Sequence, residues 1–273
     1  MKITKAIIPV AGWGTRMLPI TKAIEKCMLP IGNRPVIDFI VQDVVQAGIK
    51  DIYFVVGEDS SQLEKYYRTN IKLNDYLRRN GKEDKLPLVA PLRNVNIHFV
   101  TQPSTGGYGT SIPVGLCDEF IDDDEAALVI MGDQFFYRTD SGSNAKTLIE
   151  SVRAKRGVNA GMYGVKMPLD GIDSSIEVDD DDNFVRIIEK PARGEAPSDL
   201  QNASYYLLPK TIFSLAKTLP ANPQRGEFEI TDPLNVYTAN GGKIHVMSAS
   251  GTYLDCGTVD GWLRANNFVL NST

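Results

Sequence analysis

The chain has few of the residues that build disulfide frameworks or zinc centres. It contains three cysteines and two histidines in 273 residues. Cys27, Cys117 and Cys256 stand far apart and form no C-x-x-C pair, and His98 and His245 cannot supply a histidine-rich metal site. These counts exclude a cysteine-stapled secreted scaffold and a structural zinc domain. We expect the cysteines to be packing residues and the histidines to be ordinary structural or surface residues.

The chain also lacks an excess of basic residues. It carries 29 Lys and Arg against 34 Asp and Glu, a net charge of −5. A protein that neutralises a phosphate backbone needs a basic surface, so a nucleic-acid partner is not expected. A phosphorylated small molecule remains compatible with this balance, since a few well-placed Lys and Arg suffice for it.

Long apolar runs are missing as well. No stretch approaches the ~20 apolar residues of a membrane-spanning helix. The first residues, Met1–Pro9, lack the apolar core of a signal peptide. We therefore expect no membrane partner and a location in the reducing cytoplasm.

What the chain has is the composition of a globular protein, 42% hydrophobic and 23% charged. Short apolar runs predict strands at 6–10, 52–56, 97–101 and 126–131. Between them, segments with apolar residues at helical spacing predict helices at 36–47, 61–67, 112–117 and 145–155. Later segments predict strands at 160–165, 185–189, 205–208, 244–247 and 253–255 and helices at 212–217 and 261–270. This order predicts an α/β fold with a mostly parallel sheet, helices on both faces and an antiparallel addition. No linker or repeat interrupts it, so we expect one domain over residues 1–273.

Two polar segments stand out from this pattern. Residues 68–94 are rich in Lys and Arg and weakly periodic, which predicts an insertion with some helix. The acidic run Asp179–Asp182 lies between predicted strands and has no EF-hand spacing. This favours a solvated hairpin tip over a metal loop.

The first predicted strand ends in a glycine turn, Gly12-Trp13-Gly14-Thr15-Arg16. A dinucleotide fingerprint would need a third small residue where Met17 stands, and a P-loop would need a second glycine followed by Lys and Ser or Thr. Two interpretations remain. The turn either brings backbone N–H groups and Arg16 to an anion, or it is a tight turn beside a surface arginine.

A second segment favours the anion. Lys26-Cys27-Met28-Leu29-Pro30 places a lysine ten residues after Arg16. With G-x-G-T-R followed by K-x-x-L-P, the chain resembles the sugar-phosphate nucleotidyltransferases, and most closely the bacterial UTP–glucose-1-phosphate uridylyltransferases. The resemblance covers nearly the whole chain, in order, through Leu18–Ile24, Gln102 with Gly107–Gly109, Asp133, Ile188–Pro191, Glu195–Ser198, Gly226–Glu227 with Thr231–Asp232, and Tyr253–Gly257.

The resemblance implies a Rossmann-like nucleotidyltransferase fold. Residues 1–135 would form the nucleotide-binding half and residues 136–273 the sugar-binding half. The implied reaction is Mg²⁺-dependent transfer of a uridylyl group from UTP to a sugar 1-phosphate, with glucose 1-phosphate as the expected acceptor. The products would be a UDP-sugar, here UDP-glucose, and pyrophosphate. The family also implies a homodimer or homotetramer.

The family's functional residues carry over onto matching positions of this sequence. The catalytic cations would be Arg16 on the triphosphate, Lys26 between the α-phosphate and the incoming phosphate, and Lys190 on the sugar phosphate. Asp133 and Asp255 would bind one Mg²⁺. The nucleotide would contact Ala11, Gly12, Gly14, Thr15, Gln102 and Gly107. The sugar would contact Ser175, Glu189, Lys190 and Ser204.

This set of residues suits the reaction. A phosphate monoester has a second pKa of about 6, so it attacks the α-phosphorus as an anion and needs no general base. Catalysis then consists of bringing several negative charges into line and neutralising them. Gln102 offers both a donor and an acceptor to a pyrimidine edge. Carboxylate oxygens such as those of Asp133 are what Mg²⁺ prefers.

The sequence departs from the family near both substrates. Uridylyltransferases usually have Pro where Glu25 stands and Glu where Cys27 stands. Glu25 puts a negative charge beside Lys26, so it either points away from the phosphate or weakens triphosphate binding. Ser175 and Ser204 replace glycines that are usual on the sugar side, which leaves the sugar less defined than the reaction.

Two alternative functions stay open, the first of them motivated by these departures. A non-catalytic paralogue would bind a nucleotide sugar and regulate an active enzyme, although both metal carboxylates and both phosphate lysines are present here. A sister nucleotidyltransferase would use dTTP or CTP instead of UTP. A nicotinamide-dependent oxidoreductase is disfavoured, because Met17 replaces the third small residue of its fingerprint.

Overall fold

The protein is described by a computed structural model that covers residues 1–272. Its central sheet contains β1 (Lys2–Pro9), β4 (Asp51–Gly57), β5 (Asn96–Gln102), β6 (Glu125–Ile130), β8 (Ala160–Lys166), β9 (Ser174–Val178), β10 (Phe184–Glu189), β11 (Leu200–Pro209) and β12 (Ile244–Ser248). Two small ribbons pair β2 (Pro30–Ile31) with β3 (Arg34–Pro35), and β7 (Gln134–Tyr137) with β13 (Thr252–Asp255).

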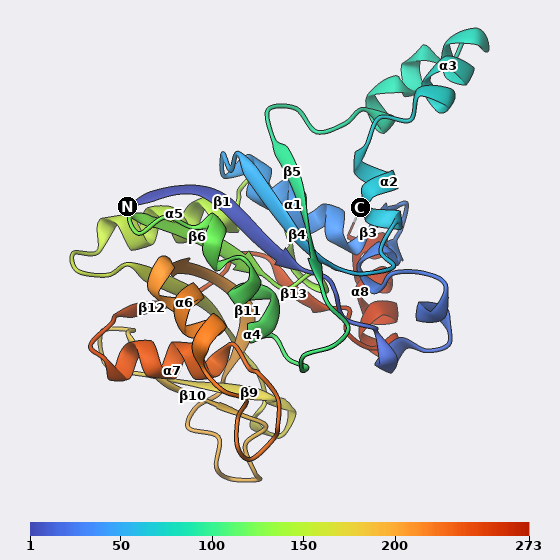
Figure 1. The fold of residues 1–273 in the computed structure, drawn as a ribbon. Helices are drawn as coiled ribbons and strands as arrows, with labels where there is room; N and C mark the ends of the chain where they lie inside the picture. Colours follow the sequence, from blue (N-terminus) through green and yellow to red (C-terminus); the bar gives the residue numbers. More distant parts are fainter. Residues whose placement is uncertain (273) are drawn as a thin grey trace.

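The helices lie around this sheet (Figure 1). They are α1 (Val36–Gln46), α2 (Gln62–Tyr67), α3 (Ile71–Arg79), α4 (Ser111–Leu116), α5 (Asn144–Ala154), α6 (Lys210–Thr218), α7 (Thr231–Ala239) and α8 (Val259–Asn271). No helix in the described part of the chain combines the length and the apolar character that a membrane crossing requires.

The central sheet is mixed, which confirms the predicted fold class. Its strand order is β10-β9-β11-β6-β1-β4-β5, with β8 beside β11 and β12 beside β8. Strands β6, β1, β4 and β5 run parallel. β11 is antiparallel to both β6 and β8, and β9 is antiparallel to β10. The antiparallel addition therefore begins where β11 joins the parallel part.

Helices cover both faces of the sheet because its strands are apolar on both faces. In β1, Ala6 and Ile8 pack into a core with residues of α1, α5 and α8, whereas Ile7 packs into a second core with residues of α4, α6 and α7. Successive side chains of a strand point to opposite faces, so a continuous apolar run needs cover on each. All three cysteines are buried and free, as predicted.

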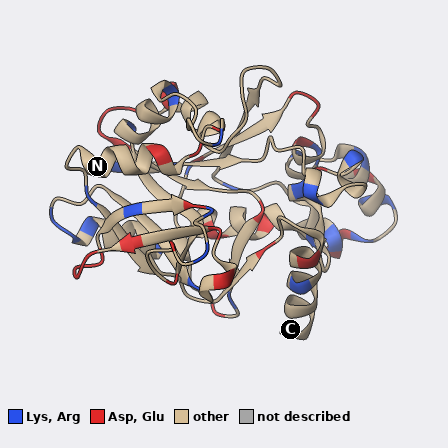
Figure 2. Cartoon of the chain, turned by 90° about the horizontal axis from the view of Figure 1, so that it is seen from below, with Lys and Arg blue, Asp and Glu red and all other residues tan. Residues whose placement is uncertain are grey.

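The residues predicted as an insertion form an arm that projects from the sheet (Figure 1). It contains α3 and the 3₁₀ segment Glu83–Val89. Residues 68–94 include seven Lys and Arg against three Asp and Glu. Figure 2 shows basic residues gathered on this projecting part. The prediction of an insertion with some helix is confirmed.

Candidate active site

The carboxyl ends of the parallel strands meet at one edge of the sheet. Gln102 is the last residue of β5 and pairs in register with Gly57, the last residue of β4. A Cβ on Gly57 would lie 3.6 Å from the carbonyl oxygen of Ala11, so Gly57 lies against the loop after β1. Ala11 and Gln102 therefore share the edge at which open α/β sheets bind ligands.

The loop after β1 is shaped by its glycines. Gly14 has φ 63° and ψ 33°, a left-handed conformation that glycine adopts without strain. The Thr21 hydroxyl donates to the Gly14 carbonyl at 2.9 Å. A Cβ on Gly12 would have no other atom within 4 Å, so the backbone there is open to a ligand. Thr15 then begins a 3₁₀ turn that carries the exposed Arg16.

A two-stranded ribbon brings the two predicted metal carboxylates together. β7 begins directly after Asp133, and its first residue, Gln134, pairs in register with Asp255 at the end of β13. The N–H of Cys256 donates to the carbonyl of Asp133 at 2.9 Å. The ribbon thus sets two residues that are far apart in sequence beside each other.

Gly257 marks the point where the charges converge. A Cβ on Gly257 would lie 2.9 Å from Asp255 Oδ1, 3.2 Å from Arg16 Nη2 and 3.3 Å from Asp133 Oδ2. A side chain here would push these groups apart, so glycine is required by close approach. No role was predicted for Gly257, although it is the last residue of the family-like segment Tyr253–Gly257.

Lys26 completes this cluster. Its Nζ lies 2.5 Å from Asp133 Oδ2, and the two side chains are 20% and 15% exposed. Asp255 is exposed at the edge, yet the protein around its carboxyl removes hydration and raises its pKa, and the Asp133 charge raises it further. Arg16 has no ion pair or side-chain hydrogen bond within residues 1–272 and is available to an anion.

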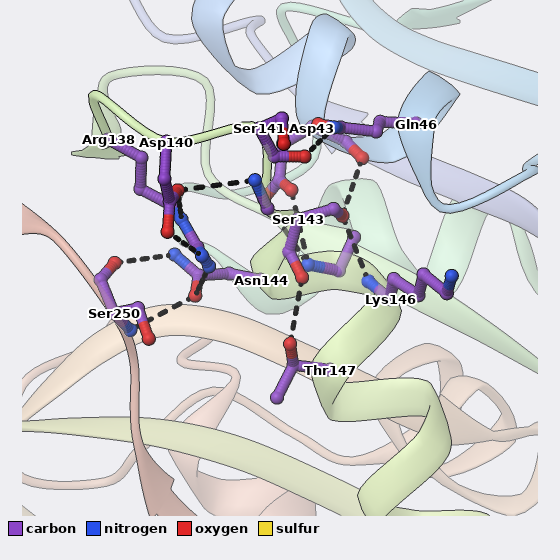
Figure 3. Close-up of polar contacts among 12 residues, drawn as sticks. Asp43, Gln46, Arg138, Asp140, Ser141, Ser143, Asn144, Lys146, Thr147 and Ser250 are labelled. Carbon is purple, nitrogen blue, oxygen red and sulfur yellow. Dashed lines mark hydrogen bonds and ion pairs between the residues drawn. The ribbon is translucent and has the colours of Figure 1, made fainter.

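The far end of the β7–β13 ribbon is fastened by Asn144, the first residue of α5 (Figure 3). Its amide donates to the Ser250 carbonyl at 2.9 Å, and its oxygen accepts from Ser250 N and Arg138 Nη1, each at 3.0 Å. The Ser143 hydroxyl anchors this helix start to α1 by donating to the Asp43 carbonyl at 3.0 Å. Arg138 follows β7 and Ser250 precedes β13, so one buried amide holds both strands and with them the two carboxylates.

The donor chemistry of Asp133 and Asp255 fits Mg²⁺. Both carboxylates face the same space. Loss of hydration around the Asp255 carboxyl and repulsion from Asp133 raise the pKa of Asp255, an effect that a cation would reverse. Residues 1–272 contain no group of three or more His, Cys, Asp and Glu that could hold a metal. One or two carboxylates combined with substrate phosphates is a common way to bind Mg²⁺.

The predicted sugar-side residues extend from the same edge. β11 is antiparallel to β6 with Tyr205 opposite Ile130, so the residues before Tyr205 continue past the end of β6, on the side of Asp133. β9 pairs with this extension, with Ser175 opposite Gln201. The sheet register therefore places both predicted subsites on one side of the molecule.

Glu189 and Lys190 lie at the end of β10. The Ser174 hydroxyl donates to Glu189 Oε1 at 2.7 Å, and Arg225 Nη1 donates to the Glu189 carbonyl at 3.4 Å. Burial raises the pKa of Glu189. Lys190 is exposed and has φ 46°, and its N–H donates to the Asp173 carbonyl at 2.6 Å. A positive φ in a residue other than glycine is strained and is often found at functional sites.

The two serines differ in their surroundings. Ser175 is fully buried, and its hydroxyl donates to the Ser198 carbonyl at 2.9 Å, so this side chain is engaged inside the sheet. Ser204 has φ 51° at the place where the β11–β8 register shifts, and its N–H donates to Asn202 Oδ1 at 3.0 Å. That backbone favours glycine. Contact of either serine with a sugar stays a prediction.

Gly107 lies in the loop after β5 and packs on Phe228. It has φ 115°, and a Cβ there would lie 2.6 Å from Phe228 Cε2. The Phe228 N–H donates to the Tyr108 carbonyl at 2.9 Å, and the Phe228 carbonyl accepts from Ser111 N at 2.8 Å. The segment around Gly226–Glu227 is thereby joined to the predicted base-reading loop.

An edge built in this way suits enzymes that transfer phosphate-containing groups, because those reactions need charge neutralisation more than a proton carrier. The chain belongs to the nucleotidyl transferase family, whose model matches residues 5–272. It is therefore a nucleotidyltransferase, as predicted.

Curated relatives cover almost the whole chain. It is 31% identical over 282 residues to the UTP–glucose-1-phosphate uridylyltransferase of Mycoplasma pneumoniae, which covers 100% of this chain and 94% of that protein. It is 31% identical over 281 residues to the UTP–glucose-1-phosphate uridylyltransferase of Streptococcus pneumoniae, covering 97% and 89%.

Solved structures agree with the fold. A UDP-glucose pyrophosphorylase complexed with UDP-glucose gives a TM-score of 0.82 at 26% identity over 100% of both chains. A UTP-bound UGPase from Acinetobacter baumannii gives a TM-score of 0.84 at 26% identity over 98% and 93%. The predicted family and fold are confirmed.

Proposed function

We propose that the chain transfers a uridylyl group from UTP to glucose 1-phosphate and releases pyrophosphate. The observation that carries the proposal is the convergence of one arginine and two carboxylates beside Gly257, with Lys26 on one of those carboxylates. Relatives named for this activity match the chain almost end to end. They do not favour a dTTP- or CTP-dependent enzyme or a non-catalytic regulator.

In this proposal the loop after β1 binds the triphosphate. The backbone is open at Gly12, and its N–H groups up to Thr15 would donate hydrogen bonds to phosphate oxygens. Arg16 would add a fixed positive charge. Gln102 and Gly107 would lie along the uracil, where the Gln102 amide can both donate and accept.

Lys26 would act on the transferred group. A new bond forms between a phosphate oxygen of glucose 1-phosphate and the α-phosphorus, and the bond from that phosphorus to pyrophosphate breaks. The attacking oxygen is already ionised near neutral pH, so no side chain needs to take its proton. The ammonium lies 2.5 Å from Asp133 and would neutralise charge where both substrates meet.

Asp133 and Asp255 would hold one Mg²⁺, which when bound supplies further neutralisation of phosphate oxygens. On the acceptor side, Lys190 would bind the sugar phosphate and Glu189 would accept hydrogen bonds from sugar hydroxyls. Ser175 and Ser204 remain the proposed neighbours of the sugar. We further propose a homodimer or homotetramer, as the family resemblance implies, and a cytoplasmic location, as the sequence composition suggests.

A pyrophosphate-release assay tests this function directly. We expect turnover with UTP and glucose 1-phosphate in the presence of Mg²⁺, and its loss on chelation with EDTA followed by recovery on adding Mg²⁺. The same assay should include the other nucleoside triphosphates and several sugar 1-phosphates. Absence of turnover with every pair would contradict the proposal, and turnover with dTTP or CTP alone would assign a sister activity.

Variants show whether that turnover uses this site. Lys26→Ala and Asp133→Ala should each lower kcat by about 10²–10³-fold, because each removes charge stabilisation from the reacting phosphates. Lys50→Ala is the matched control, since Lys50 is exposed just before β4, at the amino end of that strand. Near-wild-type kcat in both site variants would place the chemistry elsewhere.

A further inference from the structure

Glu25 directly precedes Lys26, the proposed catalytic lysine, and the structure gives its carboxylate a defined set of partners. Glu25 Oε1 accepts from the N–H groups of Ser61 at 2.8 Å and Gln62 at 2.7 Å. Glu25 Oε2 accepts from the Ser60 hydroxyl at 2.8 Å. Three donors at the start of α2 therefore satisfy this charge.

The contact is reciprocal. The Glu25 N–H donates to Gln62 Oε1 at 3.1 Å, and Gln62 Nε2 donates to the Ala23 carbonyl at 2.7 Å. Glu25 and Gln62 thus each bind the other's backbone, and the backbone of residues 23–25 is joined to the first turn of α2. We call this pair the Glu25–Gln62 joint.

The joint lies directly before Lys26. The 3₁₀ turn Lys26–Met28 begins at the next residue, and the Met28 N–H donates to the Glu25 carbonyl at 2.8 Å. The Glu25 carboxylate is held by α2, whereas the Lys26 ammonium is held by Asp133. The two neighbouring charges therefore have separate partners on different elements.

We infer that the Glu25–Gln62 joint positions Lys26 for the reaction by tying the lysine loop to α2, at the root of the projecting arm. Glu25 is on this account a positioning residue and touches no substrate. The inference rests on the proposed function for the role of Lys26, but the anchoring of the loop can be measured without turnover.

The first measurement is hydrogen exchange of the amides in residues 20–30. Loss of the joint should raise local opening of this loop. We expect Glu25→Ala to exchange at least about fivefold faster than wild type in this segment, with the sheet strands unchanged. Glu58→Gln is the control. Glu58 is an exposed carboxylate in the loop before α2, and it makes no side-chain hydrogen bond within residues 1–272.

The second measurement separates kcat from KM. Misplacement of a catalytic group by about 1 Å can cost ~100-fold, so we expect Glu25→Ala to lower kcat about 10- to 100-fold, while KM for UTP changes less than about threefold. Glu25→Gln keeps one acceptor oxygen and should recover part of kcat. Gln62→Ala should lower kcat similarly, and the double variant should be no worse than the poorer single variant, because both act through one joint.

Other results would contradict the proposed role of the Glu25–Gln62 joint or separate it from the proposed function. If Glu25→Ala leaves both loop exchange and kcat within twofold of wild type, the joint does not position Lys26. If Glu25→Ala and Glu25→Gln both lower KM for UTP and spare kcat, the carboxylate only repels the triphosphate, and the inference is wrong. If wild type shows no turnover with any substrate pair, the proposed function fails, and loop exchange alone decides the anchoring.

Discussion

Glu125, at the start of β6, is a charged residue whose surroundings control stability. Its side chain is 2% exposed and pairs with both Lys2 and Lys5 of β1. Burial would raise the pKa of this carboxyl, but hydrogen bonds from the two lysines and from the Asp122 N–H outweigh burial. They hold the pKa at about 2, against an ordinary value of 4.5. The ionised form is therefore strongly favoured in the folded protein.

Stability should consequently depend on pH through Glu125. Because the folded pKa is lowered, the contribution is fully present above about pH 5 and is lost as the pH falls toward about 2. We expect Glu125→Gln to reduce the free energy of unfolding by about 2 kcal/mol at neutral pH and to flatten its decline in acid. Urea unfolding between about pH 3 and 7 measures this, with the exposed Glu150→Gln as control. Parallel pH curves for wild type and Glu125→Gln would contradict it.

Candidate site residues could be proposed from the sequence because they occur in short segments with fixed spacing, and their roles stay predictions. Their side-chain partners could not. Glu25 had two open alternatives, and the choice depends on Ser61 and Gln62, which reach it only because α2 packs beside the loop. The sequence shows that Ser175 has a hydroxyl group but not what that hydroxyl binds. Its contact with the Ser198 carbonyl depends on how β9 and β11 pair. Such contacts follow from tertiary packing and leave no local pattern.

At the scale of elements, the β7–β13 ribbon depends on Asn144. This side chain is 1% exposed and satisfies both backbone groups of Ser250 and one N–H of Arg138. Asn144→Ala leaves these groups without partners, at about 1–3 kcal/mol for a buried unsatisfied group. We expect a loss of about 2–4 kcal/mol in stability, and a lower kcat because the ribbon aligns Asp133 with Asp255.

Thermal unfolding and steady-state kinetics measure these two effects. Asn267→Ala is the matched control, because Asn267 is exposed on α8, and it should change stability by less than about 0.5 kcal/mol. If Asn144→Ala behaved like this control, the amide would not be what fastens the ribbon.

Long apolar strands, amphipathic helices and some short elements such as β13 could be predicted, whereas other short or mixed elements could not. β7, β9 and α7 were all missed. β7 has four residues, too few for a period. α7 starts with Thr-Asp-Pro, and proline in a sequence usually argues against a helix. Here the proline lies in the first turn, where a backbone N–H has no helical partner, so it does not break the helix. β1 begins at Lys2 instead of Ala6, because its polar residues pair with Glu125.

At the scale of the whole molecule, one central sheet connects the two predicted halves. β11 from the second half lies between β6 of the first half and β8. β13, also from the second half, pairs with β7, a strand that spans the proposed boundary at residue 135. Asp255 of the second half accordingly meets Asp133 of the first. The proposed nucleotide edge is built by both halves, and the prediction of a single domain then has a thermodynamic consequence.

If the chain is one cooperative unit, heating should give one calorimetric transition, and nucleotide should move all of it. UTP with Mg²⁺ at ~100 times its Kd should add about 2.7 kcal/mol to the folded state. For a chain of this size that corresponds to a rise in Tm of roughly 5–10 °C. Asp255→Asn should reduce the shift although this residue lies in the proposed sugar-binding half, because its carboxylate faces the proposed nucleotide edge beside Arg16 and Asp133. Two separate transitions, of which UTP moved only one, would mean that the halves fold independently and that the shared sheet does not couple them.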